Sequence, residues 1–179
     1  MLASVPHLAT WKDLVTLPGD VRAEVIAGAV ETMPSPTVNH QIFIGGVQAD
    51  LVSPFMRGRG NGPGGWWIVP DVDVELGPHD VVRPDILGWR KERMVERPVR
   101  PVRTSPDWVC EVLSPSNELR DRTVKMELYR RYRVPFVWIV DVRIQYIEAF
   151  RLEGDFYVRL GAFSKETEAR LPPFDAVPL

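Results

Sequence analysis

The sequence contains very little cysteine. Its 179 residues include one, Cys110, which lies in an apolar run at residues 108–110. An internal disulfide framework is therefore excluded, and we interpret Cys110 as a small buried hydrophobe rather than a nucleophile. The sequence also has no zinc-type cluster of Cys and His, no phosphate-binding P-loop and no GxSxG hydrolase motif.

Long apolar runs are missing as well. No stretch approaches the roughly 20 apolar residues that a membrane helix needs. Residues 1–17 lack the basic start and apolar stretch of a signal peptide. We therefore expect a cytoplasmic protein that does not associate with a membrane.

The net charge of −2 gives no overall sign of a nucleic-acid partner, but cations gather locally. Residues 83–103 contain seven Lys or Arg against three acids, and residues 120–133 contain six against two. Most of these cations are arginine, whose guanidinium group can contact two phosphate oxygens at once. Solvated charged faces would give the same runs, so the two interpretations stay open.

The composition is that of a globular protein, with 45% hydrophobic and 26% charged residues. A chain of this length fits one domain, residues 1–179, and can bury roughly two-thirds of its unfolded surface.

The first half of the chain predicts two helices and four strands before residue 90. Thr10 and Asp13 resemble a capping box, which predicts a short helix over residues 11–17. Ser35 or Thr37 is expected to begin a longer helix that ends near residue 55. The predicted strands cover residues 23–26, 30–33, 66–76 and 81–89, and a glycine-rich loop at residues 57–65 precedes the third.

The second half predicts a strand, a helix and three further strands. The strands cover residues 108–113, 136–140, 145–152 and 156–160, and the helix covers residues 118–133. Residues 136–140 are almost entirely apolar, as is typical of a central strand covered on both faces. The core order is therefore helix, three strands, helix, strand (αβββαβ), an α/β fold with a mixed central sheet, flanking helices and additional N- and C-terminal strands.

Two carboxylates lie where apolar strands are predicted. Glu111 interrupts the apolar run at residues 109–113, and Asp85 opens the apolar pair at residues 86–87. A buried carboxylate is costly without a cation, which a basic side chain or a metal ion would supply. Two carboxylates on neighbouring strands suit a hard cation such as Mg²⁺.

The helix that follows Glu111 has charged residues on its apolar stripe. The stripe runs at helical spacing through Asp121, Val124, Lys125, Leu128, Tyr129 and Tyr132. Asp121 and Lys125 therefore face inward near the helix start, as expected at the edge of an active site. An i,i+4 ion pair at the edge of the core would explain the same placement.

These motifs, taken in order, resemble the Uma-type family of putative restriction endonucleases, within the PD-(D/E)XK nuclease superfamily. The similarity rests on Pro84-Asp85, residues 111–116, Asp121-Arg122, Lys125, Tyr129, Val134-Pro135 and residues 138–141. Residues 24–28, Ser35-Pro36 and His40 resemble the family's N-terminal pattern. The resemblance covers nearly the whole chain and implies a restriction-endonuclease-like fold.

The resemblance also implies a set of roles. Asp85 and Glu111 would bind Mg²⁺, or Mn²⁺ in its place, and Lys125 would orient or activate the attacking water. Leu113 stands two residues after Glu111, where the superfamily usually has its lysine, so Lys125 would substitute from the helix.

Further residues are candidates for weaker roles. Glu24 would reach the metal from the N-terminal segment, although an exposed strand carboxylate explains it too. His40 would contact substrate near a helix start, or serve as a hydrogen-bonded structural histidine. Arg90, Arg93 and Arg97 would contact DNA phosphates.

The sequence therefore predicts a metal-dependent endonuclease that hydrolyses DNA phosphodiester bonds. A catalytically inactive DNA-binding protein of the same fold and a dimeric interaction module are the alternatives. We also expect a homodimer, because duplex cleavage must reach two strands and the exposed-edge character of residues 145–152 favours association.

Overall fold

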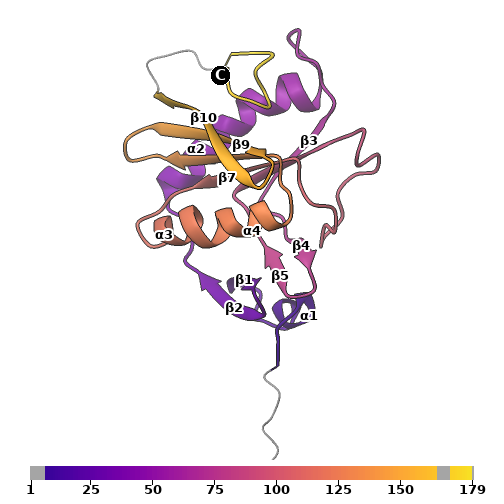
Figure 1. The fold of residues 1–179 in the computed structure, drawn as a ribbon, viewed down its shortest axis with the longest axis vertical. Coiled ribbons are helices and arrows are strands. Elements are labelled where there is room, and N and C mark those ends of the chain that lie inside the picture. Colours follow the sequence, from indigo (N-terminus) through magenta and orange to yellow (C-terminus); the bar gives the residue numbers. More distant parts are fainter. Residues whose placement is uncertain (1–6, 165–169, 179) are drawn as a thin grey trace, which may run out of the picture.

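The computed structural model describes residues 7–164 and 170–178, and within them the strands form two sheets (Figure 1). The larger sheet has six strands in the order β10-β9-β8-β7-β6-β3. Its strands are β3 (Trp66–Pro70), β6 (Ile86–Arg90), β7 (Trp108–Val112), β8 (Phe136–Asp141), β9 (Tyr146–Glu153) and β10 (Phe156–Ser164). β7 and β8 pair in parallel and the other neighbours are antiparallel, so the sheet is mixed.

The smaller sheet has four strands in the order β2-β1-β5-β4. They are β1 (Arg22–Ile26), β2 (Ala29–Met33), β4 (Val74–Gly77) and β5 (Asp80–Val82). β1 and β2 form the predicted hairpin, and Ala27 and Gly28 turn the chain with φ values of 50° and 80°. The short helix α1 (Trp11–Val15) lies beside this sheet, and its capping box is confirmed because the Asp13 carboxylate accepts the Thr10 N–H at 2.7 Å.

Two helical segments flank the larger sheet. α2 (Val38–Leu51) begins at Thr37, whose side chain accepts the His40 N–H, and continues into a π-helical turn η1 (Val52–Met56). The second segment runs through α3 (Glu118–Arg120), a π-helical turn η2 (Asp121–Lys125) and α4 (Met126–Arg131). None of the described helices is long and apolar enough to cross a membrane.

The core consists of two layers, one on each face of the six-stranded sheet. Ile44, Leu51 and Phe55 of the α2 segment pack with the even-numbered β7 residues Trp108 and Cys110. On the other face, Leu128 and Tyr129 of α4 pack with residues that include Val109 and Leu113. Glu111 shares the parity of Val109 and Leu113, so its side chain belongs to the α4 face.

The predicted core order is confirmed, since α2, β3, β6, β7, the second helical segment and β8 follow one another in that sequence. The central strand β8 is buried along most of its length between its neighbours β7 and β9. The prediction that residues 145–152 form an exposed edge is wrong, because β10 pairs with β9 along its whole length.

The predicted strands at residues 66–76 and 81–89 are also wrong as continuous units. The first divides into β3 and β4, and the second divides into β5 and β6, so that each half belongs to a different sheet. Asp71 adopts a left-handed backbone conformation at the first break, with φ 53°, and Pro84 lies at the second. Asp85 follows directly after Pro84, at the junction of the two sheets.

Candidate active site

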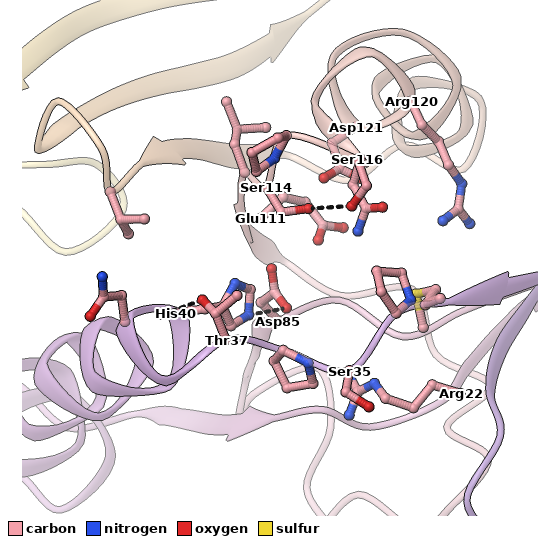
Figure 2. A pocket seen from close by; sticks show the side chains of 18 of the residues that line it. Arg22, Ser35, Thr37, His40, Asp85, Glu111, Ser114, Ser116, Arg120 and Asp121 are labelled. Atoms are coloured by element: carbon pink, nitrogen blue, oxygen red, sulfur yellow. Dashed lines mark hydrogen bonds and ion pairs between the residues drawn. The ribbon is translucent and has the colours of Figure 1, made fainter.

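The predicted site residues Asp85, Glu111 and Lys125 line one pocket of about 370 Å³ (Figure 2). One wall comes from the segment before α2 and from the start of α2. The other comes from the end of β7, the loop after it and the start of the second helical segment. Further lining residues are Thr37, His40, Ser114, Ser116, Asn117, Asp121, Arg22, Arg83, Arg120 and Arg143.

Asp85 is held at the pocket by two hydrogen bonds. Its Oδ2 accepts the backbone N–H of Val112 at 2.7 Å, which ties it to the end of β7. Its Oδ1 lies 2.9 Å from Nε2 of His40, which projects from α2. His40 therefore reaches the site, as a partner of Asp85.

Glu111 is a buried carboxylate with two partners on the second helical segment. Its Oε1 lies 2.6 Å from Nζ of Lys125, and the Tyr129 hydroxyl donates a hydrogen bond to the same oxygen. Burial raises the pKa of Glu111, and the nearby Asp121, Asp85 and Glu24 carboxylates raise it further, while Lys125 opposes them.

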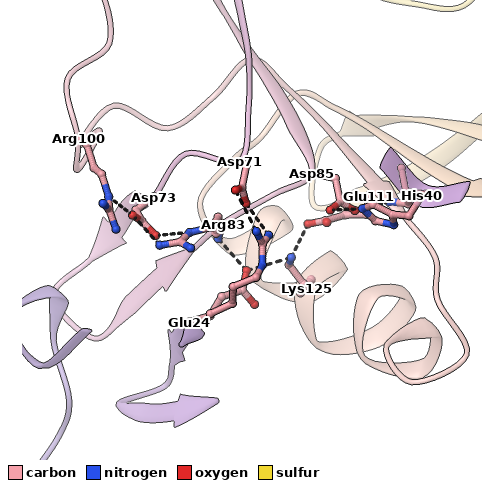
Figure 3. A network of polar contacts seen from close by, with 11 residues as sticks. Glu24, His40, Asp71, Asp73, Arg83, Asp85, Arg100, Glu111 and Lys125 are labelled. Carbon is pink, nitrogen blue, oxygen red and sulfur yellow. Dashed lines mark hydrogen bonds and ion pairs between the residues drawn. The ribbon is translucent and has the colours of Figure 1, made fainter. Parts of the chain in front are cut away.

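Lys125 joins Glu111 to Glu24, whose Oε1 lies 3.1 Å from the same ammonium group (Figure 3). The lysine side chain is buried, which by itself would lower its pKa. Glu111, Glu24 and Asp121 outweigh that effect and raise the pKa, so Lys125 keeps its proton. The site therefore contains a fixed positive charge.

Asp121 contributes a third carboxylate to the pocket lining. The residue is 4% exposed, and burial raises its pKa from 3.8 to about 6. Within the described part of the chain its carboxylate makes no hydrogen bond or ion pair. Asp121 and Lys125 mark the two ends of the π-helical turn η2, an irregularity that is frequent at functional sites.

Glu24 does not line the pocket, and its role as a metal ligand stays a prediction. The side chain is fully buried, and both of its carboxylate oxygens are already engaged. Oε1 accepts the backbone N–H of Arg83 at 2.7 Å and faces Lys125, while Oε2 pairs with Arg120. Glu24 therefore holds Lys125 and Arg120 in place beside the pocket. The interpretation of Glu24 as an exposed strand carboxylate is wrong, because the side chain is fully buried.

Arg90, Arg93 and Arg97 do not line the pocket either. Arg90 ends β6 whereas Asp85 precedes it, so they lie roughly 17 Å apart along an extended strand. Arg90 and Arg97 lie over the rings of Trp66 and Trp67, and Arg93 pairs with Asp107. Their role as DNA phosphate contacts, at a distance from this pocket, stays a prediction.

Four other arginines line the pocket, and the sequence analysis did not single them out as site residues. Arg22 pairs with Asp71, Arg83 with Asp73, Arg120 with Glu24 and Glu31, and Arg143 with Asp141 and Glu118. With Lys125 they give five basic side chains against three acidic ones in the lining, and each basic side chain is paired with at least one carboxylate. Arg83 and Arg120 lie in the two basic runs of the sequence, but a charge run does not say which of its members reach a pocket.

The chain was compared with known proteins. The Uma2 family model, described as "putative restriction endonuclease", matches residues 11–177. The chain belongs to this family. Among solved structures, one described as "a putative nuclease belonging to DUF820" from Anabaena variabilis ATCC 29413 has a TM-score of 0.74 and is 18% identical. The match covers 96% of this chain and 94% of that one. No curated protein sequence gives a significant match.

The Uma2 assignment confirms the resemblance found in the sequence, and the solved structure confirms the restriction-endonuclease-like fold. Members of restriction-endonuclease-like families usually depend on a metal ion, so the site was tested for its fit to one. Asp85 and Glu111 offer hard oxygen donors at one pocket, where the neighbouring Asp85 carboxylate raises the pKa of Glu111 and a divalent cation would relieve that repulsion.

The fit is to a metal ion with few protein ligands. Among residues 7–164 and 170–178, no three Asp, Glu, His or Cys side chains converge as a ready-made metal cage. Mg²⁺ commonly uses one or two carboxylates and completes its shell with water and substrate phosphate oxygens. Asp85 and Glu111 therefore fit Mg²⁺ better than a metal that needs an all-protein shell.

Proposed function

We propose that this protein hydrolyses phosphodiester bonds of DNA in a reaction that requires Mg²⁺, with Asp85 and Glu111 as metal ligands and Lys125 as the fixed cation beside them. The observation that carries the proposal is the 2.6 Å contact of Lys125 with Glu111 in the pocket that Asp85 also lines. A metal-binding carboxylate pair next to a lysine is the arrangement that the chemistry at one phosphate needs.

The position of Lys125 explains how a lysine serves the site although Leu113 occupies the usual place. Leu113 is buried on the α4 face of the sheet, together with Leu128 and Tyr129. Lys125 approaches Glu111 from the helical segment that covers the same face. A cation therefore lies beside Glu111 even though the strand itself supplies none.

Each group has a separate task in the proposed reaction. When bound, Mg²⁺ polarises a phosphate oxygen and lowers the pKa of a coordinated water. Lys125 stabilises negative charge that develops on the phosphate, because its ammonium group is already oriented and shielded from bulk water. The Val112 N–H and His40 hold the Asp85 carboxylate in one orientation.

DNA is the proposed substrate because the pocket lining combines these groups with four arginines. Arginine side chains that line the site suit phosphate groups of the substrate, since a guanidinium group can contact two phosphate oxygens. Each arginine also has carboxylate partners, so substrate binding requires exchange of some protein contacts for phosphate contacts.

A DNA-binding protein without catalysis is the second candidate, and one observation favours it. Both proposed metal ligands already have protein partners: Lys125 and Tyr129 for Glu111, and His40 and the Val112 N–H for Asp85. If these contacts persist in the presence of metal, the fold binds DNA without cutting it.

Cleavage of supercoiled and linear DNA with Mg²⁺, with Mn²⁺ and with EDTA separates the two candidates. We expect the wild type to cut only with metal, and Glu111→Gln to lose cleavage while it retains salt-sensitive DNA binding. Glu127→Gln is the matched control, because Glu127 is an exposed glutamate on α4 that pairs with Arg130. Binding without cleavage by the wild type would favour the second candidate, and neither binding nor cleavage would favour a protein-interaction module.

We also propose a homodimer, because cleavage of a duplex requires access to two strands and two-fold pairs are the commonest oligomers. The edge strand β10 offers unpaired backbone groups and exposes Phe156 and Val158, which favours it over β9 as the association surface. A monomer mass in light scattering at micromolar concentration would contradict this proposal.

A further inference from the structure

Hydrolysis of a phosphodiester needs a group that removes a proton from the attacking water. Lys125 is poorly suited, because a protonated ammonium that faces two carboxylates has no lone pair to offer. Glu111 and Asp85 are assigned to the metal, and Oε1 of Glu111 and both oxygens of Asp85 already have protein partners. The proton acceptor must therefore be another group that opens on the pocket.

Asp121 has the required properties. It lines the pocket beside Glu111, on the wall formed by β7 and the second helical segment, and faces Asp85 and His40 across the pocket (Figure 2). The residue is 4% exposed, yet in the described part of the chain no donor satisfies its carboxylate. A carboxylate that lines the pocket without a hydrogen-bond partner among the described residues is free to accept a hydrogen bond from a water bound there.

We propose that the Asp121 carboxylate is the general base that takes a proton from the attacking water, a role that rests on the proposed hydrolase function. An O–H bond of the water breaks and its proton passes to Asp121. The water oxygen forms a bond to phosphorus, and the bond from phosphorus to the leaving deoxyribose oxygen breaks. The leaving oxygen takes a proton from solvent, and Asp121 later returns its proton to solvent.

The other acceptors near the pocket are less suitable. His40 directs Nε2 at Asp85, so that nitrogen is already engaged. Glu24 is outside the lining, and both its oxygens are engaged by Arg83, Arg120 and Lys125.

The proton affinity of Asp121 suits this role. In the metal-free protein burial raises the pKa of Asp121 above that of an exposed aspartate, which makes its carboxylate a stronger base. Asp85 and Glu24 raise the pKa further, while Lys125 and Arg120 lower it. The charged groups near Asp121 are thus Lys125 and Arg120 on its own helical segment, Glu111 on β7, Asp85 before β6 and Glu24 on β1.

Asp121→Asn tests the proposal, with Asp155→Asn as the control because Asp155 is an exposed turn residue that pairs with Arg133. We expect Asp121→Asn to lower kcat about 10²-fold or more. Its Mn²⁺ affinity, measured by calorimetry without DNA, should stay within about two-fold of wild type, whereas loss of a metal-site group typically costs about 10-fold or more.

A pH profile of kcat supplies a readout that a purely structural role would not change. The wild-type rate should level off above the Asp121 pKa, whereas the Asp121→Asn rate should keep rising about ten-fold per pH unit as hydroxide replaces the lost base. A metal affinity that falls with the rate would overturn the proposal in favour of a ligand role. An unchanged kcat in Asp121→Asn would overturn the role of Asp121 as general base and leave the proposed hydrolase function standing. Absence of cleavage by the wild type would overturn both.

Discussion

The Nζ atom of Lys125 lies 2.6 Å from Oε1 of Glu111, which makes the second helical segment the source of the cation beside a buried strand carboxylate. The same Nζ lies 3.1 Å from Glu24. Glu24 belongs to the four-stranded sheet and Glu111 to the six-stranded sheet, so one ammonium group joins the two sheets at the site (Figure 3).

Replacement of Lys125 by methionine should destabilise the fold strongly. The change leaves Glu24 and Glu111 buried without their shared cation, which costs about 3–5 kcal/mol when a buried pair is broken from one side. Lys12→Met is the control, because Lys12 is exposed and should change stability by less than about 0.5 kcal/mol. Urea unfolding measures both variants, and equal stabilities would contradict the buried network.

Glu24→Gln should separate support of the site from metal binding. Because Glu24 lies outside the pocket lining, Glu24→Gln should weaken Mn²⁺ binding less than Glu111→Gln, which removes a proposed ligand. Stability should fall, since Arg120 and Lys125 lose a charged partner. Calorimetry and urea unfolding on the same preparation give both values. A large loss of Mn²⁺ affinity without a loss of stability would support Glu24 as a metal ligand.

The stability of the metal-free protein should depend on Asp121 between about pH 4 and pH 6. The folded state raises the Asp121 pKa from 3.8 to about 6, so in this window the folded protein holds a proton that the unfolded chain has released. Raising the pH therefore favours unfolding. Asp121→Asn should lose this contribution and gain stability relative to wild type from pH 4 to pH 7. Parallel pH profiles of unfolding free energy for the two proteins would show that the shift is absent.

Arg143→Ala should weaken DNA binding more than Arg97→Ala does. Both side chains are exposed, but Arg143 lines the pocket and Arg97 lies over Trp67 near the far end of β6. Loss of one phosphate contact should lower affinity across DNA sequences and reduce the salt slope by about one. Fluorescence anisotropy over a range of salt concentrations measures both effects. A larger effect of Arg97→Ala would place the DNA at the other end of the sheet.

The sequence predicted the core strands because apolar runs of strand length report burial directly. It failed at residues 66–76 and 81–89 because each run supplies strands to two sheets, and an apolar pattern does not say which sheet a strand joins. Pro84 was the available signal, since proline lacks the backbone donor that a continuous central strand needs.

The central site residues were predictable because each is a charged residue in an apolar context. Asp85, Glu111 and Lys125 interrupt predicted strands or an apolar helical stripe, and the structure brings them to one pocket. The burial of Glu24 was not predictable, since its partner Arg120 lies 96 residues away in the chain. The position of Arg90, Arg93 and Arg97 outside the pocket lining was not predictable either, because a local charge run carries no information about which surface it reaches.

The location of bound Mn²⁺ tests the central claim most directly. Anomalous diffraction from a crystal soaked in Mn²⁺ should show an ion coordinated by both Asp85 and Glu111, and the same soak of Glu111→Gln should show little or none. Coordination by the two carboxylates would establish the metal site on which the proposed hydrolysis depends. An Asp85–Glu111 pocket that stays empty at saturating Mn²⁺, with Lys125 still paired to Glu111, would contradict it.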